Sequence, residues 1–315
     1  MNILIIGAGA VGIGIASSLA QNADISIFAR GETAKSIKEN GIRREGLFTH
    51  YSFKPEQITV YENYKEIPKN HFNFIIITSK TTANEDISNN LNENRDILND
   101  DGKILIIQNG FGNDESYLRY FSKKKVFCAR IITGFQRPER YISEVTVYTE
   151  PILLGSLQGE NPKCLQPIAD MITHSGIKCE LTDEVDKHLW AKMLYNCALN
   201  PLGAILDVNY GKLSENPYSI ELMDNIIDEI FEVIKASPYE TLWDSSDEYK
   251  KIFYSKLIPD TYNHYSSTHN DIKRKIKTEI DSLNGTVIKL GERYGVDVSC
   301  NKIIYNLIKS IESEF

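Results

Sequence analysis

The sequence predicts an α/β protein in which a parallel sheet covered by helices is followed by an all-helical region. Short apolar runs at 3–6, 74–78 and 104–107 alternate with helical stretches, as strands buried on both faces do. Beyond residue 182 the pattern is helical. We therefore predict two domains, 1–182 and 183–315, in a chain of 315 residues that is long enough for two cores.

The first predicted strand leads directly into a glycine-rich turn. Gly7, Gly9 and Gly12 follow it, and small residues continue as a helix over 11–20. Bare backbone N–H groups at a helix N-terminus bind pyrophosphate, and a side chain at Gly7 or Gly9 would block the tight turn or the ligand. With a strand before it and a helix after it, this G-x-G-x-x-G pattern predicts a Rossmann-type dinucleotide-binding domain.

The end of the second predicted strand, 24–28, bears on the choice of dinucleotide. Arg30 follows this strand, and arginine suits the 2′-phosphate of NADP(H), whereas an acidic residue there would hold the ribose hydroxyl of NAD. Arg30 therefore favours NADP(H). Two alternatives stay open: Arg30 is a solvated loop residue, or the nearby Glu32 favours NAD.

Polar residues follow the next two strands. Lys80 comes after the strand at 74–78, and Asn109 comes after the strand at 104–107. Ligands of open α/β sheets bind beyond the carboxyl ends of the strands, so we expect Lys80 and Asn109 where cofactor and substrate meet. For Asn109 the alternative is a turn residue before Gly110.

Residues 126–157 have a different sequence pattern from the segments before them. They carry three strand-like runs without long helices between them. We expect these runs to add antiparallel strands to the edge of the sheet.

Composition and charge exclude several classes of protein. A net charge of −8 and a pI near 5.4 argue against nucleic acid or an anionic membrane as the main partner. No apolar run approaches the roughly 20 residues of a membrane span. The five cysteines are scattered without a C-x-x-C pair, which indicates neither a disulfide framework nor a zinc site. We expect a cytoplasmic protein without a metal, and a homodimer stays open.

A polar stripe is the most informative feature of the helical half. His188, Lys192, Asn196 and Asn200 recur every four residues and so share one helix face. Lysine and asparagines among apolar neighbours are unfavourable to bury unless a polar ligand, such as a carboxylate with a carbonyl, meets them. A solvated helix face is the alternative. We expect Pro201 to kink or end this helix.

A later helix is predicted from about Asp271, with Ile276 and Ile280 among its apolar positions. Glu279 flanks that apolar face, where burial would raise its pKa and a nearby lysine would lower it. A salt bridge with Lys275 at the helix edge is the alternative.

Several blocks together resemble the ketopantoate reductase family. They are GAGAVG in the N-terminal turn, QNGFGN with the Asp and Glu that follow it at 108–115, LWAKMLYNCALNPLGAI at 189–205, and YSSTHNDI followed by TEIDSLNG at 265–285. The blocks span nearly the whole chain in the order of the family. The K-x-x-x-N-x-x-x-N-P pattern is much more specific than the glycine turn.

The resemblance implies a role for each matching residue. Lys192 matches the general acid that protonates the ketone oxygen, and Glu279 matches the carboxylate that contacts the lysine or a substrate hydroxyl. Asn109 matches the asparagine beside nicotinamide and substrate. The other matches are the substrate-binding positions Asn196, Asn200 and Ser267, the cofactor turn Gly7, Gly9, Ala10, Val11 and Gly12, and the residues Arg30 and Lys80 that grip the adenosine phosphate end of NADPH.

The implied reaction is the reduction of 2-dehydropantoate to (R)-pantoate with NADPH, a step towards pantothenate and coenzyme A. Two residues depart from the family pattern near the substrate, because Tyr210 and His264 stand where many members have asparagine. A small 2-oxo acid of another kind, branched or aromatic and reduced with NADPH or NADH, is therefore the close alternative. A catalytically silent NADP-binding sensor is a third hypothesis, which Lys192 and Glu279 speak against.

Overall fold

A computed structural model describes residues 1–315, and the chain divides into two compact units. Unit 1 consists of Met1–Gln108 and Asn113–Val185, and unit 2 consists of Asn109–Gly112 and Asp186–Phe315. The short segment 109–112 thus leaves the first unit and joins the helical one. The predicted domains, 1–182 and 183–315, place residues 109–112 in the first domain.

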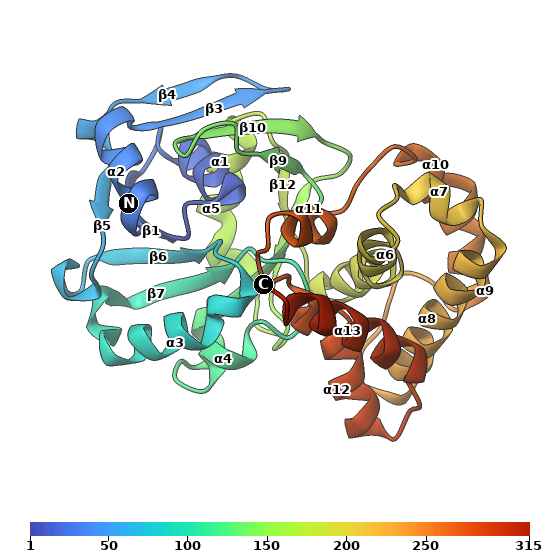
Figure 1. Cartoon of the computed structure of the whole chain (residues 1–315). Helices are drawn as coiled ribbons and strands as arrows, with labels where there is room; N and C mark the ends of the chain where they lie inside the picture. Colours follow the sequence, from blue (N-terminus) through green and yellow to red (C-terminus); the bar gives the residue numbers. More distant parts are fainter. The chain divides into compact units, whose positions relative to one another are not determined.

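Unit 1 is an α/β unit, as the sequence predicts (Figure 1). Its strands are β1 (Asn2–Ile6), β2 (Asp24–Phe28), β3 (Ile42–Gly46), β4 (Tyr51–Phe53), β5 (Thr59–Tyr61), β6 (Phe72–Ile77), β7 (Leu98–Ile106), β8 (Val126–Arg130), β9 (Gly134–Gln136), β10 (Ile142–Val147), β11 (Ile152–Gly155) and β12 (Cys179–Leu181). Its helices are α1 (Ala10–Leu19), α2 (Gly31–Asn40), α3 (Asn84–Glu93), α4 (Glu115–Leu118) and α5 (Gln166–His174).

Unit 2 is built from helices, which confirms the predicted fold class. They are α6 (Val185–Ile205), whose first residue still belongs to unit 1, α7 (Tyr210–Ser214), α8 (Pro217–Ala236), α9 (Ser246–Ile252), α10 (Ile258–Asp260), α11 (Ser267–Lys273), α12 (Asn284–Tyr294) and α13 (Ser299–Glu312). None of the helices combines the length and the hydropathy that a membrane span requires.

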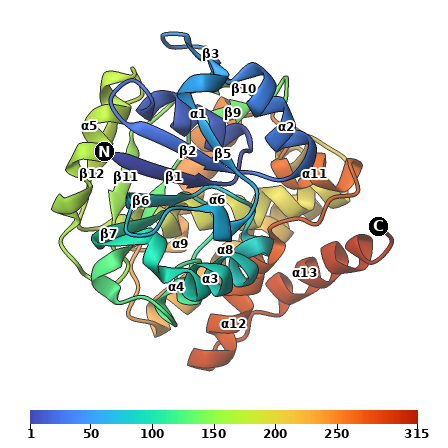
Figure 2. The same cartoon turned by 90° about the vertical axis from the view of Figure 1, so that its left-hand side faces the viewer.

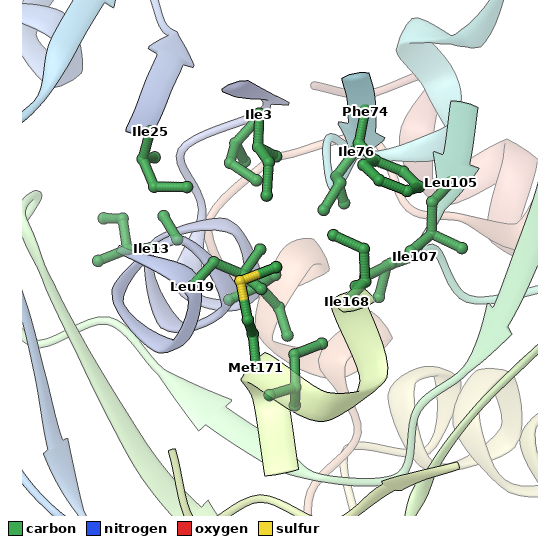
Figure 3. Close-up of a cluster of buried hydrophobic side chains, with 14 of the residues drawn as sticks. Ile3, Ile13, Leu19, Ile25, Phe74, Ile76, Leu105, Ile107, Ile168 and Met171 are labelled. Atoms are coloured by element: carbon green, nitrogen blue, oxygen red, sulfur yellow. The ribbon is translucent and has the colours of Figure 1, made fainter. Parts of the chain in front are cut away.

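The main sheet of unit 1 has eight strands in the order β12-β11-β8-β7-β6-β1-β2-β5. The strands from β8 to β5 are parallel to one another. Figure 3 shows the core on one face, where side chains of α1 and α5 such as Ile13 and Ile168 pack against Ile3 and Ile76 of the strands. Leu4, Ile6, Ile75 and Ile77, which point to the opposite face, are buried as well. Burial on both faces explains why the strands are continuous apolar runs.

Helix α1 lies between the main sheet and a second sheet of four strands, β4-β3-β10-β9 (Figure 2). A Cβ atom at Gly14 would lie 2.5 Å from the ring of Phe135 and 2.8 Å from Ser143 Oγ. Ser143 Oγ also donates a hydrogen bond of 2.7 Å to the carbonyl oxygen of Ala10. The small residues of α1 are therefore required because β9 and β10 approach its backbone closely.

The prediction for 126–157 is wrong in part. Strand β8 joins the main sheet parallel to β7, and β9 and β10 belong to the second sheet. Only β11, which pairs with β8, is an antiparallel addition to the main sheet, and β12 then lies parallel to β11. Local strand patterns do not reveal partners, and β10 pairs with β3, which lies about a hundred residues earlier in the chain.

The prediction that Pro201 kinks or ends its helix is wrong about the end. Helix α6 continues through Pro201 to Ile205. Leu199, Leu202 and Ala204 are buried around the proline, and this packing offsets the loss of one backbone hydrogen bond.

Arg44 on β3 links three elements of unit 1. Its side chain is fully buried, and its guanidinium donates hydrogen bonds to Ser18 Oγ, to the Oγ and carbonyl oxygen of Ser175, and to the carbonyl oxygen of Thr49. The guanidinium carbon lies 4.7 Å from the centre of the Tyr51 ring. Burial lowers the pKa of Arg44 to about 10. Hydroxyl and carbonyl oxygens thus hold this buried cation between α1, α5 and the second sheet.

We expect Arg44→Ala to lower the free energy of unfolding by about 2–4 kcal/mol, because it leaves a cavity and unpaired buried oxygens. Urea unfolding of the variant measures this loss. Arg43→Ala is the matched control, since the neighbouring side chain is 44% exposed and pairs with Glu45 at the surface. The control should lose at most about 1 kcal/mol, and equal losses in the two variants would contradict the structural role of Arg44.

Candidate functional site

The glycine turn between β1 and α1 has three glycines with different constraints. Gly7 has a φ of +109°, and a Cβ atom there would lie 2.4 Å from the backbone nitrogen of Ser79. At Gly12 a Cβ would lie 1.9 Å from the carbonyl oxygen of Gly7, whereas at Gly9 it would meet no atom within 4 Å. Packing therefore explains Gly7 and Gly12, while Gly9 leaves space beside the first turn of α1. Gly9 is the N-cap residue and gives α1 no side-chain cap, which suits an anionic ligand.

Arg30 and Lys80 follow the two strands that flank β1 in the sheet, β2 and β6. The Arg30 guanidinium lies 5.4 Å from the centre of the Phe28 ring, and its Nη2 lies 3.6 Å from Asp86 Oδ2. The Arg30 side chain stays 64% exposed, which leaves it accessible to a ligand and also fits the alternative of a solvated loop residue. Lys80 precedes the short turn Thr81–Ala83. Both cations thus stand at the carboxyl edge of the sheet, on the strands next to the glycine turn.

Two further residues near this edge were not predicted to have a role. Gln108 is buried, and its Nε2 donates hydrogen bonds of 2.8 Å to the carbonyl oxygen of Ser79 and to Asn84 Oδ1. It thereby holds the loop that carries Lys80. Arg137 Nη1 donates to the carbonyl oxygen of Ala8 at 3.0 Å, which brings a cation to the glycine turn. The polar run after β7 contains Gln108, but no local pattern distinguishes Arg137.

In unit 2, Lys192, Asn109 and Glu279 come together. Lys192 Nζ donates a hydrogen bond of 2.6 Å to Asn109 Oδ1. Asn109 Nδ2 lies 3.4 Å from Glu279 Oε2, to which it donates. The amide therefore links an ammonium group to a carboxylate. A lysine that is oriented in this way can stabilise a negative oxygen and donate a proton to it.

The segment 109–112 is fixed within unit 2 by its own residues. Gly110 has a φ of +95°, and a Cβ there would lie 2.4 Å from the carbonyl oxygen of Ser282. The ring of Phe111 packs 4.7 Å from the ring of Trp190 and 4.9 Å from that of Tyr239, measured between centroids. Asn109 is thus a turn residue before glycine and also a hydrogen-bonding partner of Lys192.

The polar stripe runs along α6, since Lys192, Asn196 and Asn200 lie on one helix at the predicted spacing. Asn196 and Asn200 are buried. Tyr210 Oη donates a hydrogen bond of 2.6 Å to Asn200 Oδ1, and burial raises the pKa of Tyr210 well above its usual value. The phenol thus remains a donor, so the Asn200 amide nitrogen is left to donate elsewhere.

Ser267 and His264 lie near this end of the stripe. Ser267 is the exposed first residue of α11, whereas the buried Ser266 caps that helix and donates from Oγ to the carbonyl oxygen of Asn200 at 3.1 Å. The ring of His264 lies 5.1 Å from the ring of Tyr210. The two residues that depart from the family pattern are therefore neighbours, and Tyr210 contacts one predicted substrate residue directly.

The predicted helix that would carry Glu279 is wrong. Helix α11 ends at Lys273, and Lys275 has a φ of +52°, which right-handed helices do not allow. Glu279 instead precedes the short turn Ile280–Ser282. The backbone N–H of Thr278 donates to Glu312 Oε1 at 2.7 Å in place of a helical hydrogen bond.

Known proteins resemble the chain over its full length. The family model described as "Ketopantoate reductase PanE/ApbA" matches residues 3–159, and its C-terminal counterpart matches 184–312. A 2-dehydropantoate 2-reductase of Aquifex aeolicus is 36% identical over 99% of this chain and 97% of its own length. A 2-dehydropantoate 2-reductase of Archaeoglobus fulgidus is 27% identical over 98% of this chain and 97% of its own length.

Solved structures share the fold at lower identity. A PanE/ApbA family ketopantoate reductase of Ralstonia eutropha has a TM-score of 0.85 at 22% identity and covers 100% of this chain and 99% of its own. A ternary structure of D-mandelate dehydrogenase with NADH and anilino(oxo)acetate has a TM-score of 0.86 at 21% identity, with the same coverage. The matches to both family models and the 36% identity over almost the whole length show that this chain belongs to the ketopantoate reductase family.

Proposed function

We propose that this protein reduces 2-dehydropantoate to (R)-pantoate with NADPH, a step towards pantothenate and coenzyme A. The observation that carries the proposal is the hydrogen bond of 2.6 Å between Lys192 Nζ and Asn109 Oδ1, with Glu279 on the other end of the same amide. The relatives named 2-dehydropantoate 2-reductase support the choice of substrate.

Lys192 is the proposed general acid. Hydride addition to a ketone creates an alkoxide, and an ammonium beside that oxygen stabilises the charge and then gives up its proton. Asn109 orients the ammonium through Oδ1, and Glu279 holds the other end of the amide. The buried Asn196 and Asn200 would bind the carboxylate and hydroxyl of the substrate, and Ser267 would contact it from α11.

The residues around the glycine turn fit a nicotinamide dinucleotide. Bare N–H groups of Gly9, Ala10 and Val11 at the start of α1 would bind the pyrophosphate, and the open space at Gly9 admits it. Arg30 and Lys80 would hold the 2′-phosphate of the adenosine end. The dinucleotide supplies the hydride.

The second candidate is a reductase of another branched or aromatic 2-oxo acid, with NADPH or NADH. Two observations favour it: Tyr210 replaces the usual small amide beside Asn200, and the fold is shared with a D-mandelate dehydrogenase that was solved with NADH. Since the fold does not determine the substrate, activity measurements must distinguish the candidates.

The glycines give a matched pair for testing the cofactor site. We expect Gly9→Ala to raise the Kd for NADPH about tenfold or more while stability changes by less than about 1 kcal/mol, because the new methyl group meets only ligand. Gly12→Ala should instead lower the free energy of unfolding by more than about 2 kcal/mol, since its Cβ meets backbone. Fluorescence titration and urea unfolding measure both variants, and unchanged NADPH affinity in Gly9→Ala would argue against the site.

Lys192→Ala tests the chemical step. We expect kcat to fall about 100- to 10,000-fold, while the Kd for NADPH stays nearly unchanged, because the ammonium acts on the ketone. Stopped-flow turnover and equilibrium titration give the two values. The control is Lys212→Ala, which removes a lysine that is 57% exposed and paired with Glu215. Wild-type turnover in Lys192→Ala would sink the mechanism, whereas a wild-type protein that binds NADPH and reduces no 2-oxo acid would favour the sensor hypothesis.

A panel of 2-oxo acids, each assayed with NADPH and NADH, tests the substrate. We expect 2-dehydropantoate with NADPH to have the highest kcat/KM, at least about tenfold above acids that lack its hydroxyl, because those acids leave buried amides unpaired. 2-Oxoisovalerate and phenylglyoxylate are the branched and aromatic comparisons. A higher kcat/KM for either comparison would move the assignment to the second candidate.

A further inference from the structure

Glu312, at the end of α13, carries a buried carboxylate that accepts two hydrogen bonds from Thr278. Its side chain is 4% exposed. Its Oε1 accepts hydrogen bonds from Thr278 N at 2.7 Å and from Thr278 Oγ1 at 2.6 Å. Its Oε2 lies 2.9 Å from Lys309 Nζ. A carboxylate buried to this degree needs such partners, so Thr278 is held firmly at this point.

Thr278 immediately precedes Glu279, in a stretch that belongs to no helix or strand. Thr278 is 1% exposed, and its Oγ1 accepts a hydrogen bond of 3.2 Å from the backbone N–H of Ile280. The backbone on both sides of Glu279 is therefore tied to Thr278. The carbonyl oxygen of Glu279 accepts hydrogen bonds of 3.0 Å from the backbone N–H and from Oγ of Ser282. The N–H groups of Thr278 and Ile280 are bonded to side chains instead, so the position of Glu279 depends in part on those side-chain contacts.

Two residues of α13 also contact Asp281, which lies two positions after Glu279. Asp281 Oδ1 accepts from Tyr305 Oη at 2.7 Å, and Asp281 Oδ2 lies 3.3 Å from Lys309 Nζ. Tyr305, Lys309 and Glu312 are four and three residues apart and so lie along one helix face. We call these three residues the C-terminal clamp.

We propose that the C-terminal clamp, through Glu312, is a positioning device for Glu279. Glu312 bonds to Thr278 and Lys309, not to Asn109 or Lys192. It therefore acts through Thr278, which fixes where the Glu279 carboxylate meets Asn109 Nδ2. The inference rests on the proposed role of Glu279 in the reaction. Small displacements of groups that orient a reacting centre reduce turnover strongly.

The test compares Glu312→Ala and Glu312→Gln in the wild-type and Glu279→Ala backgrounds. Glu312→Ala should lower kcat for 2-dehydropantoate about 10- to 100-fold while the Kd for NADPH is unchanged. Glu312→Gln should recover most of the activity, because its amide oxygen can still accept both hydrogen bonds from Thr278. In the Glu279→Ala background, Glu312→Ala should add little further loss, since both changes act on one group.

Several controls separate positioning from folding. Glu314→Ala removes an exposed carboxylate two residues later and should behave as wild type. If Glu312→Ala does not fold, Thr278→Val is the second test at nearly constant volume. It removes both hydrogen bonds of Oγ1, to Glu312 and from the N–H of Ile280, and keeps the bond from Thr278 N to Glu312. It should give a smaller loss of kcat with a thermal unfolding midpoint near that of the wild type.

Two outcomes would overturn the inference and differ from a failure of the proposed function. Wild-type kcat in Glu312→Ala and Thr278→Val, with Glu279→Ala impaired, would sink the clamp alone. An equal proportional loss of kcat from Glu312→Ala in the wild-type and Glu279→Ala backgrounds would also overturn the inference, because it indicates a general effect on the fold. If Glu279→Ala itself keeps wild-type turnover, the proposed role of Glu279 fails and the positioning role fails with it.

Discussion

The hydrogen bond between Lys192 and Asn109, 2.6 Å long, is the interaction on which the proposed chemistry depends. It joins α6 to a segment that lies more than eighty residues earlier in the chain. An asparagine amide accepts at one end and donates at the other, so it can face an ammonium and a carboxylate at once. An aspartate at this position would repel Glu279 and pair with Lys192 as an ion. The amide orients the lysine and leaves the positive charge of its ammonium group available to stabilise an alkoxide.

The loop that carries Asn109 explains why this contact is stable. Gly110 approaches the backbone at Ser282 so closely that only glycine fits, and Phe111 fills a space beside Trp190. The aromatic ring thereby supplies the hydrophobic burial that a short polar loop lacks. An Asn-Gly pair, which by itself indicates only a turn, serves here both the turn and the contact with Lys192.

Much of the fold could be predicted because its signals are local. The apolar strands β1, β6 and β7 and the polar period of α6 follow directly from residue spacing. The second sheet could not be predicted, since β3 carries Arg43 and Arg44 in a short polar sequence whose burial depends on serines far away in the chain. Glu279 shows the same limit: the apolar spacing favours a helix, but Glu312 takes the Thr278 hydrogen bonds from a distance of 34 residues.

We propose that the type of reaction and the choice of substrate depend on different residues of unit 2. Lys192, Asn109 and Glu279 form the group that would act on the ketone, whereas Tyr210 acts on Asn200, two helical turns further along α6. A phenol that donates to Asn200 Oδ1 occupies one lone pair of that oxygen, so we propose that Tyr210 favours a substrate that presents an acceptor to the Asn200 amide nitrogen. An asparagine at 210 could have donated or accepted. On this proposal, substitutions at Tyr210 and His264 would change the substrate while the proposed general acid Lys192 and its partners stay the same.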